Sequence, residues 1–127
     1  MTQVAIINAL FTELSGVSGL PTILYPNVEY STKPSEYIEA FILPTGEENE
    51  YMQGNTRQTG IMQINCVCEA GKGVVVANSY ADIVKASFAV GTNLSGVKIM
   101  KPPNINPAIQ DGSNYIVPID IRYVIYN

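Results

Sequence analysis

The fold of this chain is decided by its last stretch, Pro107-Ala-Ile-Gln-Asp-Gly-Ser-Asn-Tyr-Ile-Val-Pro-Ile-Asp-Ile-Arg-Tyr-Val-Ile-Tyr-Asn127. Apolar residues recur there at every second position, which predicts a long strand with one wholly apolar face. That face consists of Tyr115, Val117, Ile119, Ile121, Tyr123 and Ile125. The Asp111-Gly112 pair before it predicts a tight turn. Pro118 has no amide hydrogen to donate, so it predicts a sheet edge or a bulge at its position.

Two further strands, over residues 36–43 and 59–69, are predicted to pair antiparallel. The side chains that fall on one side of the first are Tyr37, Phe41 and Leu43. The inward face of the second consists of Met62, Ile64, Cys66 and Cys68. The segment between them, Glu47–Gln58, is polar and has no periodic apolar face. We therefore expect a long projecting loop there, mobile in the isolated subunit and ordered by a partner.

Two amphipathic helices complete the predicted fold. The first is capped by Thr2, ends at Gly16, and has its apolar stripe at Val4, Ile6, Ile7, Leu10, Phe11 and Leu14. The second spans about residues 74–88, with one face formed by Val76, Tyr80, Ile83, Val84 and Phe88. Short strands are predicted at Thr22–Tyr25 and Val97–Lys101. The sequence thus predicts one α+β domain, residues 1–127, with a mainly antiparallel sheet of four to five strands and two α-helices packed on one face.

The composition indicates a protein whose surface is covered by partners or by identical copies. Charged residues make up only 14% of the 127 residues, against about 25% in a typical domain. The net charge is −4 and the isoelectric point about 4.6, so a nucleic-acid partner is not expected. The apolar run Val4–Leu10 is too short to span a membrane, and no basic residue precedes Lys33 as in a signal peptide. We expect a soluble, cytosolic protein.

Residue types that carry catalysis or bind metals are sparse. The chain has no histidine, and its two cysteines, Cys66 and Cys68, stand two apart on one strand, a spacing that suits neither a disulfide nor a zinc site. We expect both to be buried free thiols. Gly71-Lys-Gly73 lacks the glycine and hydroxyl residue of a phosphate-binding loop and predicts a tight turn. The sequence therefore predicts no cofactor, no metal and no enzymatic activity.

Several short blocks, taken in order, resemble the tail terminator-like proteins of long-tailed bacteriophages. The blocks are Pro26-Asn27, Gly60-Ile-Met-Gln-Ile64, Ala81-Asp-Ile-Val84 with Phe88, and Pro107-x3-Asp111-Gly-x2-Tyr115-x2-Pro118. They run over nearly the whole chain with matching lengths between them. Asn114 departs from the pattern, because relatives often place a large aromatic residue there.

The resemblance implies a virion structural protein that forms a ring, typically a hexamer, at the head-proximal end of the tail. Such a ring caps the tail tube, stops its polymerisation and provides the surface that joins tail to head. The implied partners are further copies of the chain, the tail tube protein and a head-completion or neck protein, met in the host cytoplasm during assembly. No membrane or sequence-specific nucleic-acid contact is implied.

A ring with head-to-tail contacts needs two different complementary patches on each subunit. Interface anchors are often aromatic, methionine or arginine side chains, and charged residues set specificity. The predicted interface residues are Glu47, Glu48, Glu50, Tyr51, Met52, Arg57, Lys98 and Lys101. Two other functions stay open: a neighbouring neck or tail-completion protein, and a small carboxylate-dependent hydrolase, which would need two close carboxylates in an apolar cavity.

Overall fold

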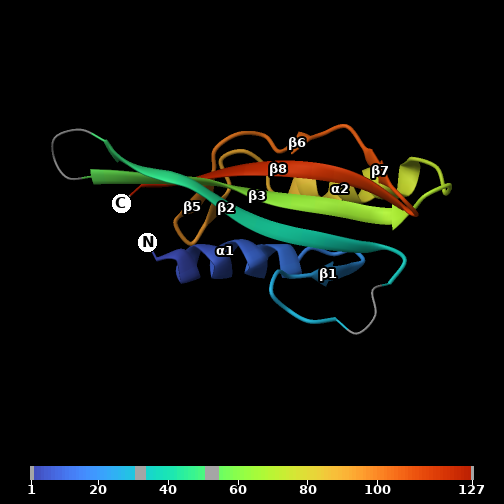
Figure 1. Cartoon of the computed structure of the whole chain (residues 1–127). Helices are drawn as coiled ribbons and strands as arrows, with labels where there is room; N and C mark the ends of the chain where they lie inside the picture. The colour runs from blue at the N-terminus through green and yellow to red at the C-terminus, as the bar shows by residue number, and fades with distance from the viewer. Residues whose placement is uncertain (1, 31–33, 51–54, 127) are drawn as a thin grey trace.

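The computed structural model describes residues 2–30, 34–50 and 55–126, with the backbone alone at 47–50 and 55. Its elements, in chain order, are α1 (Gln3–Ser15), β1 (Thr22–Leu24), β2 (Tyr37–Glu50), β3 (Asn55–Glu69), α2 (Val75–Ser87), β4 (Asn93–Leu94), β5 (Val97–Ile99), β6 (Asn104–Ile105), β7 (Ile109–Asp111) and β8 (Asn114–Tyr126). Three long strands, β2, β3 and β8, form the centre of a curled sheet, and their far ends extend past the start of α1 (Figure 1).

The α+β class is confirmed, but the sheet is larger and more mixed than predicted. Eight strands of the described residues join it, in the order β1-β2-β3-β8-β5-β4, with β6 and β7 also paired to β8. β1 runs parallel to β2, whereas the other strand pairs of the described residues are antiparallel. The strands that the sequence did not predict, β4, β6 and β7, have two or three residues each, too few to show a period.

β8 has the inward face that its alternation predicts. Val117, Ile119, Ile121, Tyr123 and Ile125 are buried, and Tyr115 is half-buried. The prediction of an edge or bulge at Pro118 is correct in part: β8 pairs with β3 there without a register shift, but on its other side the strand pairing is interrupted between Ile119, opposite β6, and Ile116, opposite β7. The Pro118 carbonyl accepts a hydrogen bond from the Asn106 amide at 2.9 Å, on the β6 side. Since the N–H and C=O of a strand residue face the same side, the missing donor falls in the gap between β6 and β7.

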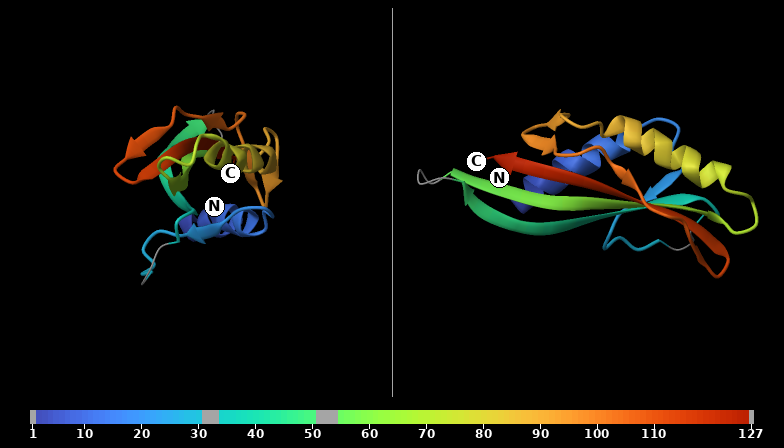
Figure 2. Two further views of the ribbon diagram at one scale, coloured as in Figure 1. Left: turned by 90° about the vertical axis from the view of Figure 1, so that its right-hand side faces the viewer. Right: turned by 90° about the horizontal axis from the view of Figure 1, so that it is seen from above.

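Both helices cover the concave face of the sheet, as predicted (Figure 2). α1 has the predicted caps: the Thr2 hydroxyl accepts a hydrogen bond from the Ala5 amide at 3.2 Å, and Gly16 ends the helix. Its buried stripe is Ile6, Leu10 and Leu14, while Val4, placed on the stripe by the sequence, is exposed.

The predicted apolar face of α2 is only partly correct. Val84 and Phe88 are buried, but Val76 is exposed and Tyr80 and Ile83 are half-buried. The buried stripe instead runs through Ala77, Ala81 and Val84. Alanine was not counted as a core residue in the helical pattern, although its small side chain lets a helix approach a sheet closely.

The pairing of β2 with β3 is confirmed, but the side of β2 that carries Tyr37, Phe41 and Leu43 is the outer, convex side. Ile38 and Ala40 point into the main core, and Tyr37 joins a small outer cluster with Leu24 and Val67. β2 is apolar on both faces in this region, so alternation alone did not reveal which face is inward.

The predicted long loop over Glu47–Gln58 is wrong. β2 continues to Glu50 and β3 begins at Asn55, with pairs in register from Gly46–Thr59 to Glu50–Asn55 beyond a register shift between Pro44 and Gly46. A strand ladder uses backbone groups, which polar residues supply as well as apolar ones, and β8 flanks β3 as far as Arg57. Tyr51 and Met52 lie outside the described residues, so the expected mobility of that segment stays a prediction.

The two cysteines are free and buried on the inner face of β3, as predicted. Burial raises the pKa of the Cys66 thiol to about 12, and the neighbouring Cys68 adds to this effect. Because the unfolded thiol has a pKa near 9, its contribution to stability is complete below about pH 9 and is lost as the pH rises toward 12.

We therefore expect both thiols to resist alkylation in the folded protein at pH 8. Two alkyl groups should add once the chain is unfolded in denaturant, as read by intact mass. The midpoint of denaturant unfolding should be constant from pH 7 to 8 and should fall above pH 9. A chain whose mass is two units low and that takes up no reagent in denaturant would contradict this assignment.

Candidate functional site

The predicted interface residues lie toward the projecting end of the sheet. Glu47, Glu48 and Glu50 are strand residues of β2, where their backbones pair with Gln58, Arg57 and Asn55 of β3. Tyr51 and Met52 lie outside the described residues. Lys98 is an exposed residue of β5, and Lys101 is exposed just beyond the end of that strand.

The structure brings three of these positions together around Tyr126. Arg57 is in register with Tyr126 of β8 on one side and with Glu48 of β2 on the other. The Lys98 ammonium nitrogen lies 6.0 Å from the centre of the Tyr126 ring, at the outer limit of a cation–π contact. Tyr126, half of whose surface is exposed, was placed by the sequence on the mixed face of its strand but not in the predicted interface. Lys101 is not part of this group.

Exposed apolar side chains on the convex face were missing from the predicted site. Phe41 and Leu43 on β2 and Met100 after β5 are all exposed. Leu43 is in register with Ile61, which is in register with Arg122, and the Met100 amide donates to the Arg122 carbonyl at 2.9 Å. One row across the outer face therefore carries Leu43, Ile61, Arg122 and Met100. The sequence placed Phe41 and Leu43 on one side of their strand but could not decide from alternation whether that side faces the core or the solvent.

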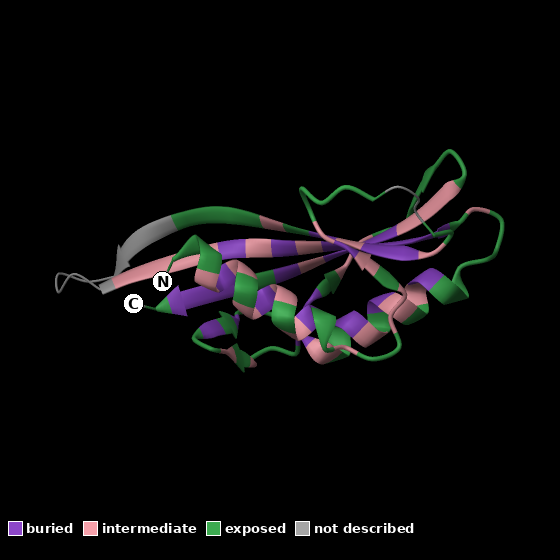
Figure 3. Cartoon of the chain, turned by 90° about the horizontal axis from the view of Figure 1, so that it is seen from below, coloured by how far each residue is buried: buried purple, intermediate pink, exposed green. Residues whose placement is uncertain are grey.

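The edge of β2 is open along most of its length. β1 pairs only with Tyr37–Glu39, and no other described strand lies beside β2 on that side. The stretch from Leu43 to Gly46 is continuously exposed (Figure 3). An open strand edge presents unpaired amide and carbonyl groups that bind readily to another chain. Pro44 and the nearby register shift interrupt this edge, a feature that restricts where a further strand can pair.

Titratable side chains gather in one cavity, near the start of α2. The cavity is about 420 Å³ and is lined in part by Glu36, Cys68, Glu69 and Lys72. The Tyr80 hydroxyl donates to the Glu36 carboxylate at 2.5 Å, which raises the pKa of Tyr80 to about 12. Burial also raises the pKa of the Cys68 thiol, so it stays protonated and a weak nucleophile at neutral pH. Glu69 is exposed and the lining is mainly polar, unlike the apolar cavity with two carboxylates that a hydrolase would need.

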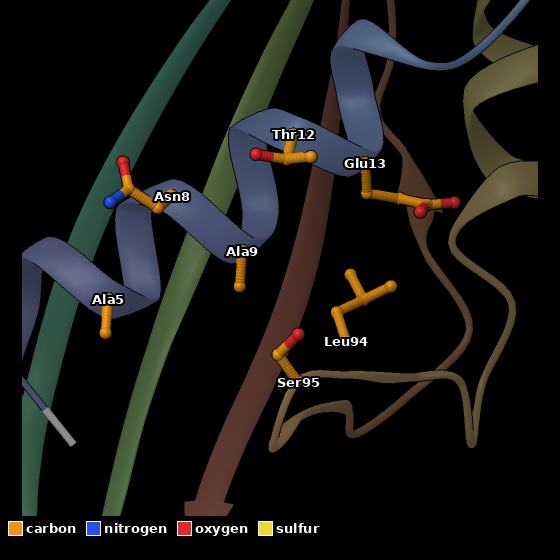
Figure 4. A pocket seen from close by; sticks show the side chains of 7 residues that line it. All are labelled: Ala5, Asn8, Ala9, Thr12, Glu13, Leu94 and Ser95. Carbon is orange, nitrogen blue, oxygen red and sulfur yellow. The ribbon is translucent and has the colours of Figure 1, made fainter.

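A shallow groove of about 450 Å³ separates α1 from the turn between β4 and β5 (Figure 4). Its walls are mostly small side chains, among them Ala5, Ala9 and Ser95, and Glu13 is its only titratable residue. Across residues 2–30, 34–50 and 55–126, no three His, Cys, Asp or Glu side chains are close enough to hold a metal ion. In the same residues, no helix is both long enough and apolar enough to cross a membrane.

Comparisons with known proteins establish the fold. No curated protein sequence matches this chain. One solved structure has a TM-score of 0.75 at 22% identity, and the match covers 98% of this chain and 96% of the other. Another, from the virion of a native gene transfer agent particle, has a TM-score of 0.72 at 14% identity, and all of both chains is covered. At these identities the likeness establishes the fold.

The family is established by sequence rather than by fold. The model of the phage tail terminator protein family matches residues 5–123, which include α2, all of α1 but its first two residues, and all of the sheet except the last residues of β8. The matched region contains β2 with its open edge and the exposed row of the convex face. This chain, a structural protein of a phage tail, belongs to the phage tail terminator family.

Proposed function

We propose that this protein forms a closed ring, a hexamer, that caps the head-proximal end of the tail tube. The ring stops polymerisation of the tube and offers its other surface to the head-completion or neck protein. It assembles in the host cytoplasm and remains in the virion, and one domain spanning residues 1–127 performs the role without enzymatic activity. The observation that carries the proposal is the family match over residues 5–123.

The surface of the protein supports this role. A tube cap must contact identical neighbours, the tube below and the neck above, and so needs most of its surface for protein contacts. The chain has a low charge content of 14%, and the described residues expose apolar side chains on the convex face. We propose that the interface includes Glu47, Glu48, Glu50, Tyr51, Met52, Arg57, Lys98 and Lys101, as the sequence predicts, together with Tyr126 and the exposed row at Leu43 and Met100.

A neighbouring neck or tail-completion protein is the alternative, because a protein of that kind would share the size and charge of this one. The two roles differ in the first partner that is bound. A terminator binds bare tail tubes that have no head or neck attached, whereas a neck protein needs the terminator to be present. Co-sedimentation of the purified protein with isolated tubes should therefore give a saturable complex of a few subunits per tube. Saturation at a ratio proportional to tube length would indicate binding along the wall instead.

A further inference from the structure

The two edges of the sheet have opposite charge. The acidic edge is β2 with the residues before it: residues 34–50 contain five glutamates and no lysine or arginine. β1 and β2 stand at one end of the strand order. At the other end are β4 and β5, and the basic edge is formed there by residues 85–101, which contain Lys85, Lys98 and Lys101 and no acidic residue. All three lysines are exposed.

Each edge also exposes large apolar side chains. On the acidic edge these are Phe41 and Leu43, with 36% and 48% of their surfaces exposed. On the basic edge they are Val90 and Met100, with 54% and 38% exposed. Burial of such side chains supplies affinity at about 25 cal/mol per Å², whereas exposed charge pairs chiefly set partner choice and association rate. Both edges therefore combine a source of affinity with a source of specificity.

Charge disfavours a symmetric pairing of like edges. In a two-fold dimer each patch meets its own copy, so glutamates would face glutamates and lysines would face lysines. A head-to-tail contact instead places the acidic edge of one subunit against the basic edge of another. The open part of β2, from Ala40 onward, also leaves backbone groups available to the arriving chain.

We propose that the acidic edge of each subunit binds the basic edge of a second copy of this chain, with Phe41 and Leu43 packing against Val90 and Met100. The contact is heterologous, so its repetition leads to a ring when the rotation between subunits closes. This inference rests on the proposed function, because the contact is the one that would build the proposed ring. It names which surfaces meet and leaves the remaining faces of the ring to the tube and the neck.

Charge-swap variants test the pairing. The first variant carries Glu47→Lys, Glu48→Lys and Glu50→Lys, which makes both edges basic. The second carries Lys98→Glu and Lys101→Glu, which makes both edges acidic. A control variant carries Glu13→Lys and Glu69→Lys, which changes the net charge as much as the second variant does, in the opposite sense, and leaves both edges as they are. Circular dichroism and thermal melting check that all three are folded, and sedimentation velocity at low salt measures association over a range of concentrations.

Each of the two charge-swap variants, alone, should associate at least about tenfold more weakly than the wild type or the control. A tenfold change corresponds to a loss of about 1.4 kcal/mol of association free energy when the attraction between edges becomes repulsion. An equimolar mixture of the first and second variants should form closed assemblies, since every contact then joins a basic edge to an acidic one. A mixture of the control with the second variant should form closed assemblies of the control alone, because the altered basic edge of the second variant repels the acidic edge of either chain. High salt should weaken the mixed assembly.

The outcomes separate the interface from the function. If the mixture of charge-swap variants associates no more than each variant alone, the pairing of edges is wrong, even where the wild type still caps tubes. If both charge-swap variants associate as well as the wild type, the subunits meet through other surfaces. If the control associates as weakly as the charge-swap variants, the effect is one of net charge alone. Either result overturns the inference. If the edges pair as expected but the protein does not bind tail tubes, the proposed function fails and the contact stands. If only tubes, and not second copies, lose affinity in the first variant, the acidic edge serves the tube instead.

Discussion

Replacing Phe88 by alanine is expected to lower the free energy of unfolding by about 3–5 kcal/mol. Phe88 ends α2, has no exposed surface, and belongs to the main core between the helices and the sheet. Its ring cannot be replaced by neighbouring side chains, because α2 otherwise buries only alanines and Val84. The alanine variant leaves a cavity where the helix meets the sheet.

Urea unfolding monitored by circular dichroism measures this effect. The matched control is Val75→Ala, which removes apolar atoms from a side chain of α2 that is 73% exposed and should change stability by less than about 0.5 kcal/mol. If Phe88→Ala costs no more than Val75→Ala, the end of α2 is not packed as described here.

Gly60→Ala is expected to cost about 3 kcal/mol, the upper end of the range for overpacking a core. A Cβ atom at Gly60 would lie 2.1 Å from the Tyr123 hydroxyl oxygen and 2.3 Å from ring atom Cζ. Tyr123 is opposite Gly60 in the register of β3 with β8 and is buried, so its ring fills the space that a side chain would occupy. An alanine there must displace the tyrosine from the core.

A double-mutant cycle identifies the cause. Tyr123→Leu removes the ring, so adding Gly60→Ala to that variant should cost much less than adding it to the wild type. Gly16→Ala is the control, because its nearest heavy atom would be 3.5 Å away and its backbone is helical. Strictly additive effects of Gly60→Ala and Tyr123→Leu would show that the two residues do not compete for the same space.

The sequence predicted the elements whose periodicity extends over many residues. β8 and α1 were located from their apolar spacing and caps, and the inner face of β3 was correct from Met62 to Cys68. The sequence did not predict that the polar residues at the ends of β2 and β3 belong to these strands, and it assigned them to a loop. The part of β2 from Gly46 to Glu50 is held by backbone pairing with β3, and β3 is in turn paired with β8. These contacts join segments far apart in the sequence, so local composition does not show them.

The candidate site was predicted from side-chain types and was therefore incomplete. The glutamates and lysines of the predicted interface stay a prediction, and Phe41 and Leu43, which the sequence placed together on one side of their strand, were not included in it. Apart from Glu39, β2 is apolar on both sides from Tyr37 to Leu43, so only the placement of the helices decides which side faces water. Tyr126 has the residue type of an interface anchor, but its position beside Lys98 depends on the packing of β5 against β8.

The central claim is that this chain ends the growth of a phage tail tube. The most direct test is to polymerise purified tail tube protein with and without this protein and to measure tube lengths by negative-stain electron microscopy over time. The account predicts that substoichiometric amounts stop elongation at one end, where a ring of density is visible, while the Glu13→Lys, Glu69→Lys control acts like the wild type. Tubes that keep growing at the same rate, with no density at either end, would contradict it.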